Sequence, residues 1–480
     1  MPSFAEKAGD LAVRTERNSA WRQRECFNLI PSEATPSLLV KMCEIADPSG
    51  RYAEHRAMKG EEVYFYQGTD FIRDVEIECP KELAAFLGCT DIELRPISGQ
   101  MANEVVFKGL VRFLNRGRAQ GQLSRRMRLV LNNELIYGGH LSAQPMGALF
   151  NFVEEDPATG KEQVVNFPVL KDNPYKPDVD RLAVLLESHK PELVIFGKSM
   201  FLYREPVKFV ADLVRGWKER PVLMFDMAHV LGLCGAFQDP FEEGADVVTG
   251  STHKTFFGTQ RGVVAGNIPK SSPFRPLWVE IKGRAFPGST SNHHLGTLLG
   301  LLMASYEMNA FKEPFQKQVR ANAKALAKAL HGHGVPVEGD PADGYTETHQ
   351  VIIRVKSFGP GMEIARRLET NNVLTNYQAL PDDATFLESS GIRLGVQEMT
   401  RFGMVEKDFD MLAGLMSDII VRNKPAVADV ALYRKNFLTM GFTLPPAEAL
   451  PLAARILSSV IPDPGYAALF VENLRRATGA

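Results

Sequence analysis

Short apolar runs alternate with longer amphipathic stretches from about residue 90 onward. These runs lack the strict alternation of a half-buried strand, and they are typical of strands buried on both faces. The amphipathic stretches between them have the period of helices, which favours parallel crossover connections. The pattern therefore predicts an α/β fold around a mainly parallel sheet. The apolar runs lie at residues 128–131, 193–196, 222–225, 247–249 and 263–265.

The remaining pattern predicts a second, smaller α+β domain and helices at both ends of the chain. A chain of 480 residues is longer than one hydrophobic core usually supports. Strands are expected at residues 350–355 and 391–396, and helices at 360–369 and 407–421. We therefore expect an N-terminal helical arm at 1–24, a large domain at 25–294, linking helices at 295–331, a small domain at 332–424 and a C-terminal helical extension at 425–480.

Composition and charge exclude several classes of partner. The net charge of −2 and the lack of a basic run argue against nucleic acid and anionic membranes as partners. The five cysteines include no CxxC pair, and His293 and His294 lack carboxylate or thiolate partners for a metal. No apolar run reaches the ~18 residues of a membrane span, and charges stand where a signal peptide would be apolar. We expect a cytoplasmic protein without a metal.

Lys254 is the first candidate for covalent chemistry, because it follows the apolar run 245–249 within the segment Ser251-Thr252-His253-Lys254-Thr255. A lysine shielded from water favours its neutral amine, and the neutral amine is the form that attacks an aldehyde. The alternative is a lysine whose charged end reaches solvent from a strand end.

Asp226 ends another apolar run, and His229 follows three residues later. A carboxylate at a strand end can pair with a pyridinium nitrogen, and a lysine with such an aspartate is typical of enzymes that use pyridoxal phosphate. Asp226 can instead cap a helix that begins near Met227, and His229 can be a buried core histidine.

Two turns could face a phosphorylated ring. Ser98, Gly99 and Gln100 precede a long amphipathic stretch, and the N–H groups at the start of a helix suit a phosphate. An ordinary serine cap is the alternative. In the glycine-rich turn at 138–142, His140 is placed to stack on a planar ring.

Glu54, Tyr66 and Arg393 are candidates for substrate contacts. Glu54 lies in an aromatic-rich region with Tyr66, where a desolvated carboxylate can carry protons, although such clusters are often only packing. Arg393 is expected on a short strand, and a guanidinium grips a carboxylate with two hydrogen bonds. A surface arginine is the alternative.

These segments, in this order, resemble the serine hydroxymethyltransferase family across residues 25 to 420. The matching segments are LIPSEAT (29–35), RYAE (51–54), ISGQMAN (97–103), GGHL (138–141), FDMAHVLGL (225–233), STHKT (251–255), RG (261–262) and SGIRLG (390–395). The resemblance implies a pyridoxal-phosphate-dependent enzyme of fold type I, with a mainly parallel seven-stranded sheet between helices and a small α+β domain. It also implies a homodimer with shared active sites.

The resemblance assigns roles residue by residue. Lys254 would form the Schiff base, Asp226 would pair with the pyridine nitrogen and His140 would stack on the ring. The phosphate would lie at Ser98 and Gly99, and Gln100 and Ser251 would also bind the cofactor. Ser199 and His229 would lie near the 3-oxygen, and His253 beside the lysine. Arg393 and Ser32 would hold the substrate carboxylate, while Glu54 and Tyr66, supplied across the dimer, would handle protons at the substrate hydroxyl.

Three segments depart from the family pattern. The stretch between Glu54 and Tyr66 is about four residues longer. Residues Thr290-Ser291-Asn292-His293 replace a Gln-Gly-Gly-Pro turn, so side chains stand where backbone approaches the neighbouring subunit's phosphate. The segment from Asn372 to Ser390 is longer and carries Tyr377, Asp382 and Asp383. These departures leave the use of tetrahydrofolate open.

The leading hypothesis is a transferase or lyase that makes or breaks the Cα–Cβ bond of serine, threonine or glycine, with an aldehyde as the other substrate. Hydroxymethyl transfer with tetrahydrofolate and folate-independent threonine aldolase or transaldolase activity both fit. A second class keeps pyridoxal phosphate but decarboxylates, oxidises or transaminates a small amino acid. A third is a non-catalytic scaffold protein, which would have no chemical need for Lys254, Asp226 and Arg393 together.

Overall fold

A seven-stranded sheet forms the centre of the larger part of the molecule. The structure is a computed structural model that describes residues 1–58, 61–118, 122 and 124–478. Among these residues the largest sheet has the strand order β4-β10-β9-β8-β7-β5-β6. Neighbouring strands are parallel except at β10, which is antiparallel to β9 and β4. The predicted mainly parallel sheet is confirmed. Its strands are β4 Asp91–Glu93, β5 Val130–Asn132, β6 Val164–Asn166, β7 Leu193–Phe196, β8 Val222–Asp226, β9 Val247–His253 and β10 Phe257–Gly266.

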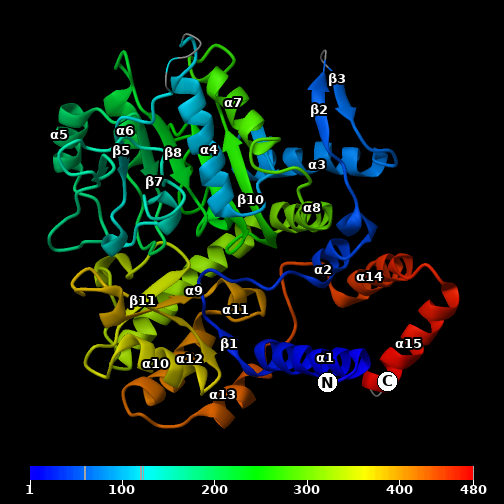
Figure 1. The fold of residues 1–480 in the computed structure, drawn as a ribbon. Helices are drawn as coiled ribbons and strands as arrows, with labels where there is room; N and C mark the ends of the chain where they lie inside the picture. The colour runs from blue at the N-terminus through cyan, green and yellow to red at the C-terminus, as the bar shows by residue number, and fades with distance from the viewer. Residues whose placement is uncertain (59–60, 119–121, 123, 479–480) are drawn as a thin grey trace.

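Both faces of this sheet are buried, as its uninterrupted apolar strands predict. Along β8, Val222 and Met224 pack into one apolar cluster, whereas Leu223 and Phe225 pack into another on the opposite face. This alternation follows from the period of two of a β-strand. Helices lie on both sides of the sheet (Figure 1). They include α3 Asp70–Leu87, α4 Gly99–Leu114, α5 Val179–His189, α6 Val207–Val214, α7 Arg275–Ala285 and α8 Leu295–Ala310.

A three-stranded antiparallel sheet lies in the lower half of the molecule in Figure 1. Its order is β11-β14-β13, and both strand pairs are antiparallel. A separate two-stranded parallel pair joins β1 to β12, so the segment that begins at Phe27 pairs with this C-terminal half. The strands are β1 Phe27–Asn28, β11 Gln350–Arg354, β12 Val373–Leu374, β13 Asn376–Gln378 and β14 Gly391–Gly395, and the helices nearby are α9 Lys312–Gly332, α10 Gly361–Glu369, α11 Gln397–Arg401, α12 Glu406–Ile420 and α13 Val427–Arg434.

The terminal segments are helical. The N-terminal α1 (Phe4–Ala20) begins with a capping box between Ser3 and Glu6, and none of its residues is buried within the chain. The C-terminal extension contains α14 (Pro446–Val460) and α15 (Pro464–Thr478). Helix α14 continues through Pro451. Ala449 and Ala453 of α14 pack against Leu39 of α2 (Leu38–Glu44).

The longer stretch between Glu54 and Tyr66 forms a β-hairpin that projects from the body of the molecule (Figure 1). It consists of β2 (His55–Met58) and β3 (Glu61–Tyr64), and His55 is paired with Tyr64. Among the described residues, no helix is both long and apolar enough to cross a lipid bilayer. The division of the chain into five domains and segments stays a prediction.

Candidate active site

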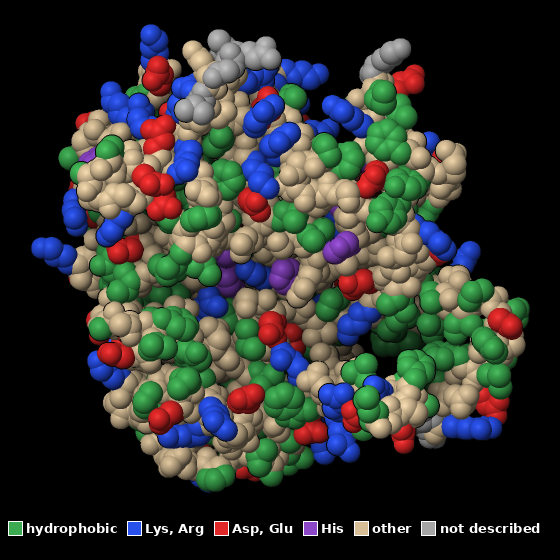
Figure 2. Space-filling view, viewed as in Figure 1, with side chains coloured by type: hydrophobic (Ala, Val, Ile, Leu, Met, Phe, Trp, Pro, Cys, Tyr) green, Lys and Arg blue, Asp and Glu red, His purple; other side chains and the backbone are tan. Residues whose placement is uncertain are grey.

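The candidate residues collect at the carboxyl edge of the large sheet. Asp226 is the last residue of β8, Lys254 follows β9 directly and Ser199 lies three residues after β7. Ligands of open parallel sheets bind at this edge. Figure 2 shows histidine side chains around a basic side chain where the two halves of the molecule meet.

Lys254 is buried without a neutralising partner in direct contact. Its side chain is 9% exposed, and no hydrogen bond or ion pair joins it to another described residue. Burial lowers the pKa of Lys254 to about 8, although the charge of Asp226 opposes this shift and Arg393 adds to it. About a tenth of the amine is therefore neutral at pH 7, far more than for an ordinary lysine, and the neutral amine is the nucleophile.

Asp226 is held in a dense hydrogen-bond network. Its Oδ2 accepts from the side chain of Asn103 at 2.7 Å and from the hydroxyl of Ser142 at 3.1 Å, and its Oδ1 accepts from the N–H of Ala228 at 3.0 Å. Burial alone would raise the pKa of Asp226, but these hydrogen bonds and the charge of Lys254 outweigh it and keep the pKa below the ordinary value. The carboxylate is therefore ionised and fixed in orientation.

The alternative in which Asp226 caps a helix that begins near Met227 is wrong. Residues 228–230 form a turn, followed by a short 3₁₀ helix at Leu231–Leu233. The N–H of Ala228 bonds to the carboxylate of Asp226, which therefore closes the turn instead of capping a helix. This turn carries His229 into the site, where it is 3% exposed.

Three histidines lie in a row beside Lys254. The ring centroids of His140 and His229 are 5.7 Å apart, and those of His229 and His349 are 6.4 Å apart. Burial lowers the pKa of His140 to about 4 and that of His349 to about 3, and it lowers the pKa of His229 well below the ordinary value. All three rings are therefore neutral at pH 7.

A hydrogen bond fixes the tautomer of His229. The side-chain amide of Gln350 donates to Nδ1 of His229 at 3.2 Å. This Nδ1 is therefore an acceptor, and the hydrogen of the ring is on Nε2, from which it can be donated. Nδ1 of His140 contacts both the N–H and the hydroxyl of Ser142.

The N-terminus of α4 packs closely against the strands that carry Lys254. The hydroxyl of Ser98 caps α4 by accepting from the N–H of Met101 at 3.1 Å, so the serine cap is present. A Cβ on Gly99 would lie 2.3 Å from Oγ of Ser251, and a Cβ on Gly262 would lie 2.1 Å from the carbonyl oxygen of Ser98. The glycines permit this approach, which brings a helix N-terminus beside β9. Gln100 is exposed in the first turn of α4.

Arg393 reaches the site from β14. Its Nη1 donates to the carbonyl oxygen of Ser199 at 2.7 Å, and its Nε donates to Oδ1 of Asn376 at 3.4 Å. Burial lowers the pKa of Arg393 to about 10, so it stays charged at pH 7. The Ser199 hydroxyl faces the carbonyl oxygens of Gly138 and Gly139 at 3.4 Å, which places it beside the turn before His140.

Ser32 and His253 line a cavity of about 560 Å³ together with Asn28, Thr35 and Glu398. Burial lowers the pKa of His253 to about 4, so its ring is neutral at pH 7. The loop that carries Ser32 is held by a hydrogen bond of 3.1 Å between Nε2 of His349 and the carbonyl oxygen of Pro31. The cavity therefore opens onto two of the predicted site residues.

Glu54 and Tyr66 are not brought to Lys254 within the chain. Among the described residues, no hydrogen bond, ion pair or ring contact joins either side chain to Lys254, Asp226 or Arg393. Glu54 is half-buried at the base of the hairpin, and Tyr66 is 42% exposed and lies against Tyr52 at 5.3 Å.

Sequence reasoning gave no site role to four polar residues that contact the predicted ones. Asn103 lies within the quoted ISGQMAN segment and Ser142 follows two residues after His140, so their positions were a usable signal. Gln350 and His349 lie in the lower half of the molecule, and no local pattern connects them to His229.

An ion pair and hydrogen bonds hold the longer segment from Asn372 to Ser390 in place. Asp382 pairs with Arg354 at 2.7 Å, and Oδ2 of Asp383 accepts from the N–H groups of Leu380 and Ser390 at 2.8 Å. These carboxylates tie the segment to β11 and close its own loop. These contacts, and not contacts with the candidate active site, orient the two carboxylates.

Comparison with known proteins agrees with this arrangement. The family model described as serine hydroxymethyltransferase matches residues 9–416. The chain belongs to the serine hydroxymethyltransferase family. It is 36% identical over 426 residues to the serine hydroxymethyltransferase of Pyrobaculum arsenaticum, covering 88% of this chain and 91% of that protein. It is 33% identical to the serine hydroxymethyltransferase of Sulfolobus acidocaldarius, covering 96% of this chain and 100% of that protein.

A solved structure gives the same fold. The crystal structure of L-threonine transaldolase from Pseudomonas fluorescens, in its internal aldimine state, superposes with a TM-score of 0.76 and 23% identity. The match covers 94% of this chain and 98% of that chain, and the predicted fold type I is confirmed. Membership of the serine hydroxymethyltransferase family also confirms pyridoxal phosphate as the cofactor. The residues present fit this group, since a buried unpaired lysine, an ionised aspartate and a glycine-lined helix N-terminus meet at one edge.

Proposed function

We propose that this enzyme makes or breaks the Cα–Cβ bond of a small β-hydroxy amino acid, with serine, threonine and glycine as its candidate substrates. The observation that carries the proposal is the pair of Lys254 and Asp226. Lys254 is buried with a pKa lowered to about 8, and Asp226 is held ionised by three hydrogen bonds. A reactive amine and a fixed carboxylate are the two groups that a pyridoxal phosphate enzyme needs most.

Different residues are assigned to different parts of the cofactor. Pyridoxal phosphate, when bound, supplies an electron sink that stabilises negative charge at the substrate Cα. Lys254 would hold its aldehyde carbon and Asp226 its ring nitrogen. The N-terminus of α4 would hold its phosphate through Ser98 and Gly99, and Gln100 and Ser251 of β9 would also contact the cofactor.

The neutral histidines orient the ring without adding charge. His140 would lie against the ring face, and His229 with Ser199 would donate hydrogen bonds toward the 3-oxygen. His253 precedes Lys254 in the chain and lies at the cavity shared with Ser32. Because burial keeps the pKa values of His140, His229 and His253 below neutral, these contacts do not compete with Asp226 for the ring's positive charge.

Arg393 and Ser32 would bind the substrate carboxylate. A guanidinium has five N–H donors, and Arg393 directs only two of them toward described residues, Ser199 and Asn376. The remaining donors are available for a carboxylate. The bond to Ser199 holds the guanidinium in one orientation, which lowers the entropy that substrate binding costs.

Glu54 and Tyr66 would act in the active site of a second subunit. Both lie at the base of the projecting hairpin and make no described contact with Lys254 of their own chain. A homodimer with shared sites supplies the proton carrier that the carboxyl edge of the large sheet otherwise lacks. There Glu54 would take the proton of the substrate hydroxyl as the bond breaks.

The acceptor separates two versions of this function. Transfer of a hydroxymethyl group needs tetrahydrofolate as a second cofactor, whereas threonine aldolase or transaldolase chemistry needs only an aldehyde. The hairpin and the residues Asn292 and His293 depart from the family pattern. Because of these departures, the folate-independent reaction is tested on equal terms with the folate-dependent one. Decarboxylation, oxidation or transamination of a small amino acid is the alternative of another class.

One assay distinguishes these reactions. Purified enzyme is incubated with serine, threonine or glycine, with and without tetrahydrofolate and an added aldehyde, and the products are identified by mass spectrometry. Folate-dependent glycine from serine supports hydroxymethyl transfer. Folate-independent glycine and acetaldehyde from threonine support aldolase or transaldolase activity. Carbon dioxide or a keto acid as the main product would reject the proposal. We also propose a cytoplasmic enzyme with small-molecule partners, without nucleic acid or membrane.

A further inference from the structure

The loop before α8 grips the segment that carries Glu54. The side-chain amide of Asn292 donates to the carbonyl oxygen of Arg51 at 2.7 Å, and its Oδ1 accepts from the N–H of Ala53 at 3.4 Å. Asn292 therefore pairs with a donor and an acceptor of the backbone directly before Glu54. In the family pattern a glycine stands at this position, and a glycine has no side chain to make these bonds.

Glu76 of α3 holds the same segment from its other end. Its carboxylate accepts from the hydroxyl of Tyr64 at 2.6 Å and from Nε2 of His293 at 2.7 Å. The ring of His55 stacks on Tyr64 with centroids 4.4 Å apart, and its Nδ1 lies 3.4 Å from Glu76. His55 follows Glu54, and Tyr64 precedes Tyr66 by two residues. Glu54 is therefore next to the anchored His55, and Tyr66 is two residues from the anchored Tyr64.

His293 connects this anchor to the strands around Lys254. Arg261, fully buried on β10, donates to Nδ1 of His293 at 2.8 Å, so the hydrogen of the ring is on Nε2 and points to Glu76. Burial lowers the pKa of His293, an effect that Glu76 opposes and Arg261 reinforces. The carbonyl oxygen of Arg261 accepts from the hydroxyl of Thr252, two residues before Lys254, at 3.1 Å.

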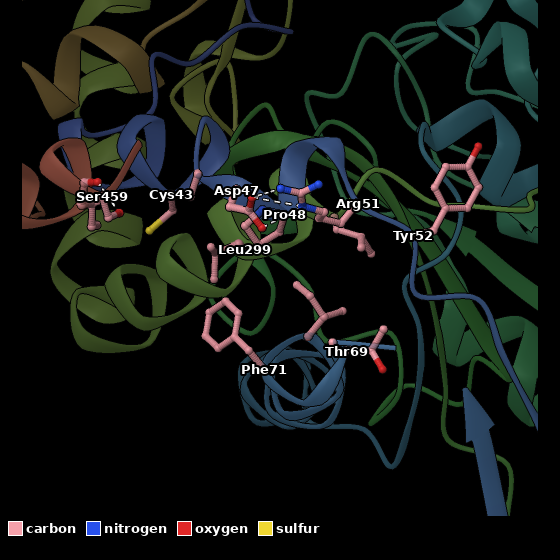
Figure 3. Close-up of a pocket in the computed structure, with 14 residues that line it drawn as sticks. Cys43, Asp47, Pro48, Arg51, Tyr52, Thr69, Phe71, Leu299 and Ser459 are labelled. Atoms are coloured by element: carbon pink, nitrogen blue, oxygen red, sulfur yellow. Dashed lines mark hydrogen bonds and ion pairs between the residues drawn. The ribbon is translucent and has the colours of Figure 1, made fainter. Parts of the chain in front are cut away.

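A cavity of about 460 Å³ lies behind the segment, between α2, α3, α8 and α14 (Figure 3). Arg51 and Tyr52 line it, and the Nε of Arg51 lies 3.0 Å from both carboxylate oxygens of Asp47. The ring of Tyr52 contacts that of Tyr66. Asn292 therefore holds the backbone of Arg51, and Asp47 holds its side chain. Tyr66 packs against Tyr52, the residue that follows Arg51.

We propose that Asn292 and His293 are positioning residues that fix Glu54 and Tyr66 for proton transfer. This inference rests on the proposed function, in which Glu54 and Tyr66 handle protons at the substrate hydroxyl. A proton carrier displaced by about 1 Å can lower the rate by about 100-fold, so anchors on both sides of Glu54 have a direct kinetic effect. Neither residue contacts Lys254 of its own chain in the part that the structure describes, so the bond between Lys254 and the cofactor is expected to form in variants of either residue.

The central test replaces Asn292 with the family's glycine. Asn292→Gly should speed hydrogen–deuterium exchange in residues 51–58 and lower kcat of Cα–Cβ cleavage about tenfold, with little change in the KM of the amino acid or in the yellow absorbance of the bound cofactor. The matched control is Asn267→Gly, at an exposed position just after β10 whose side chain makes no hydrogen bond or ion pair with a described residue. The control should behave as wild type in both measurements.

A second pair of variants tests the Glu76 anchor. His293→Gln keeps a donor toward Glu76 and should retain most of the wild-type kcat. His293→Phe removes the donor to Glu76 and the ring acceptor for Arg261, and it should lose at least about tenfold. If His293→Phe does not fold, the Asn292→Gly result decides alone. Wild-type kcat in Asn292→Gly overturns the positioning role, whether or not exchange is faster. A wild-type enzyme without Cα–Cβ cleavage would reject the proposed function, while the exchange measurement would still test the anchor.

Discussion

The guanidinium of Arg393 donates to the carbonyl oxygen of Ser199 at 2.7 Å. Arg393 lies on β14 and Ser199 follows β7, so this bond joins the two sheets across the site. Gln350 of β11 donates to the same oxygen at 3.1 Å. The group proposed to bind the substrate carboxylate is therefore oriented by the protein itself, and its position depends on how the two halves of the molecule meet.

Arg393→Lys should weaken binding of the amino acid. An ammonium cannot replace a guanidinium that bonds to Ser199 and a carboxylate together. A hydrogen bond to a charged group contributes about 1.5–3 kcal/mol, so the KM of the amino acid should rise about tenfold or more. The yellow absorbance should be unchanged. Arg220→Lys is a control, because Arg220 makes a two-pronged pair with Asp246 away from the site. Equal KM values in both variants would contradict the assignment of Arg393.

The reaction of Lys254 with its cofactor should depend on pH with a midpoint near 8. Burial lowers the pKa of Lys254 to about 8, and only the neutral amine reacts, so the rate should rise with pH and level off above that value. Stopped-flow absorbance of cofactor-free protein mixed with pyridoxal phosphate measures this rate. Lys254→Ala should abolish the yellow absorbance. A midpoint near the ordinary value of 10.5, or a yellow Lys254→Ala protein, would reject the assignment.

The buried His349 should make the fold sensitive to acid. Its folded pKa of about 3 lies below the ordinary 6.5, so between these values the unfolded chain binds more protons and stability is lost as the pH falls. One such group adds a slope of about 1.4 kcal/mol per pH unit. His349→Gln keeps a donor for Pro31 and removes this titration, so its free energy of unfolding should fall less steeply.

Urea unfolding at a series of pH values between 3 and 6.5 measures the slope for His349. The exposed His331 provides the control, and His331→Gln should leave the slope unchanged. Parallel curves for wild type and His349→Gln would show that protonation of His349 does not limit stability in acid.

Asn103→Ala should weaken cofactor binding through Asp226. The variant removes a 2.7 Å hydrogen bond to the carboxylate, which raises the pKa of Asp226 and lets the carboxylate turn. A lost bond of about 1.5–3 kcal/mol corresponds to a Kd for pyridoxal phosphate about tenfold higher or more. Titration of cofactor-free protein measures Kd. Asn166→Ala is a control, because Asn166 bonds to Asn132 at the sheet edge and not to Asp226. Unchanged binding in Asn103→Ala would contradict this account.

The sequence predicted the parts of the site that depend on strand order. Asp226 and Lys254 end apolar runs, and parallel strands bring their carboxyl ends to one edge. The residues that surround them come from distant segments and follow no local period. Gln350 reaches His229 only because the two halves of the molecule meet there. The turn after Asp226 also escaped prediction, because Met227-Ala228-His229 has helical composition but is held in a turn by the Asp226 carboxylate.

The pairing of β1 with β12 has a consequence for how the protein is made. Phe27 pairs with Val373, and the loop that carries Ser32 is held by His349, so some contacts that secure an early segment of the chain come from residues synthesised much later. Since chains emerge from the ribosome N-terminus first, the loop proposed to bind the substrate lacks these contacts until β12 has been made. Incomplete polypeptides that end before β12 should therefore be inert, whatever the state of their large sheet.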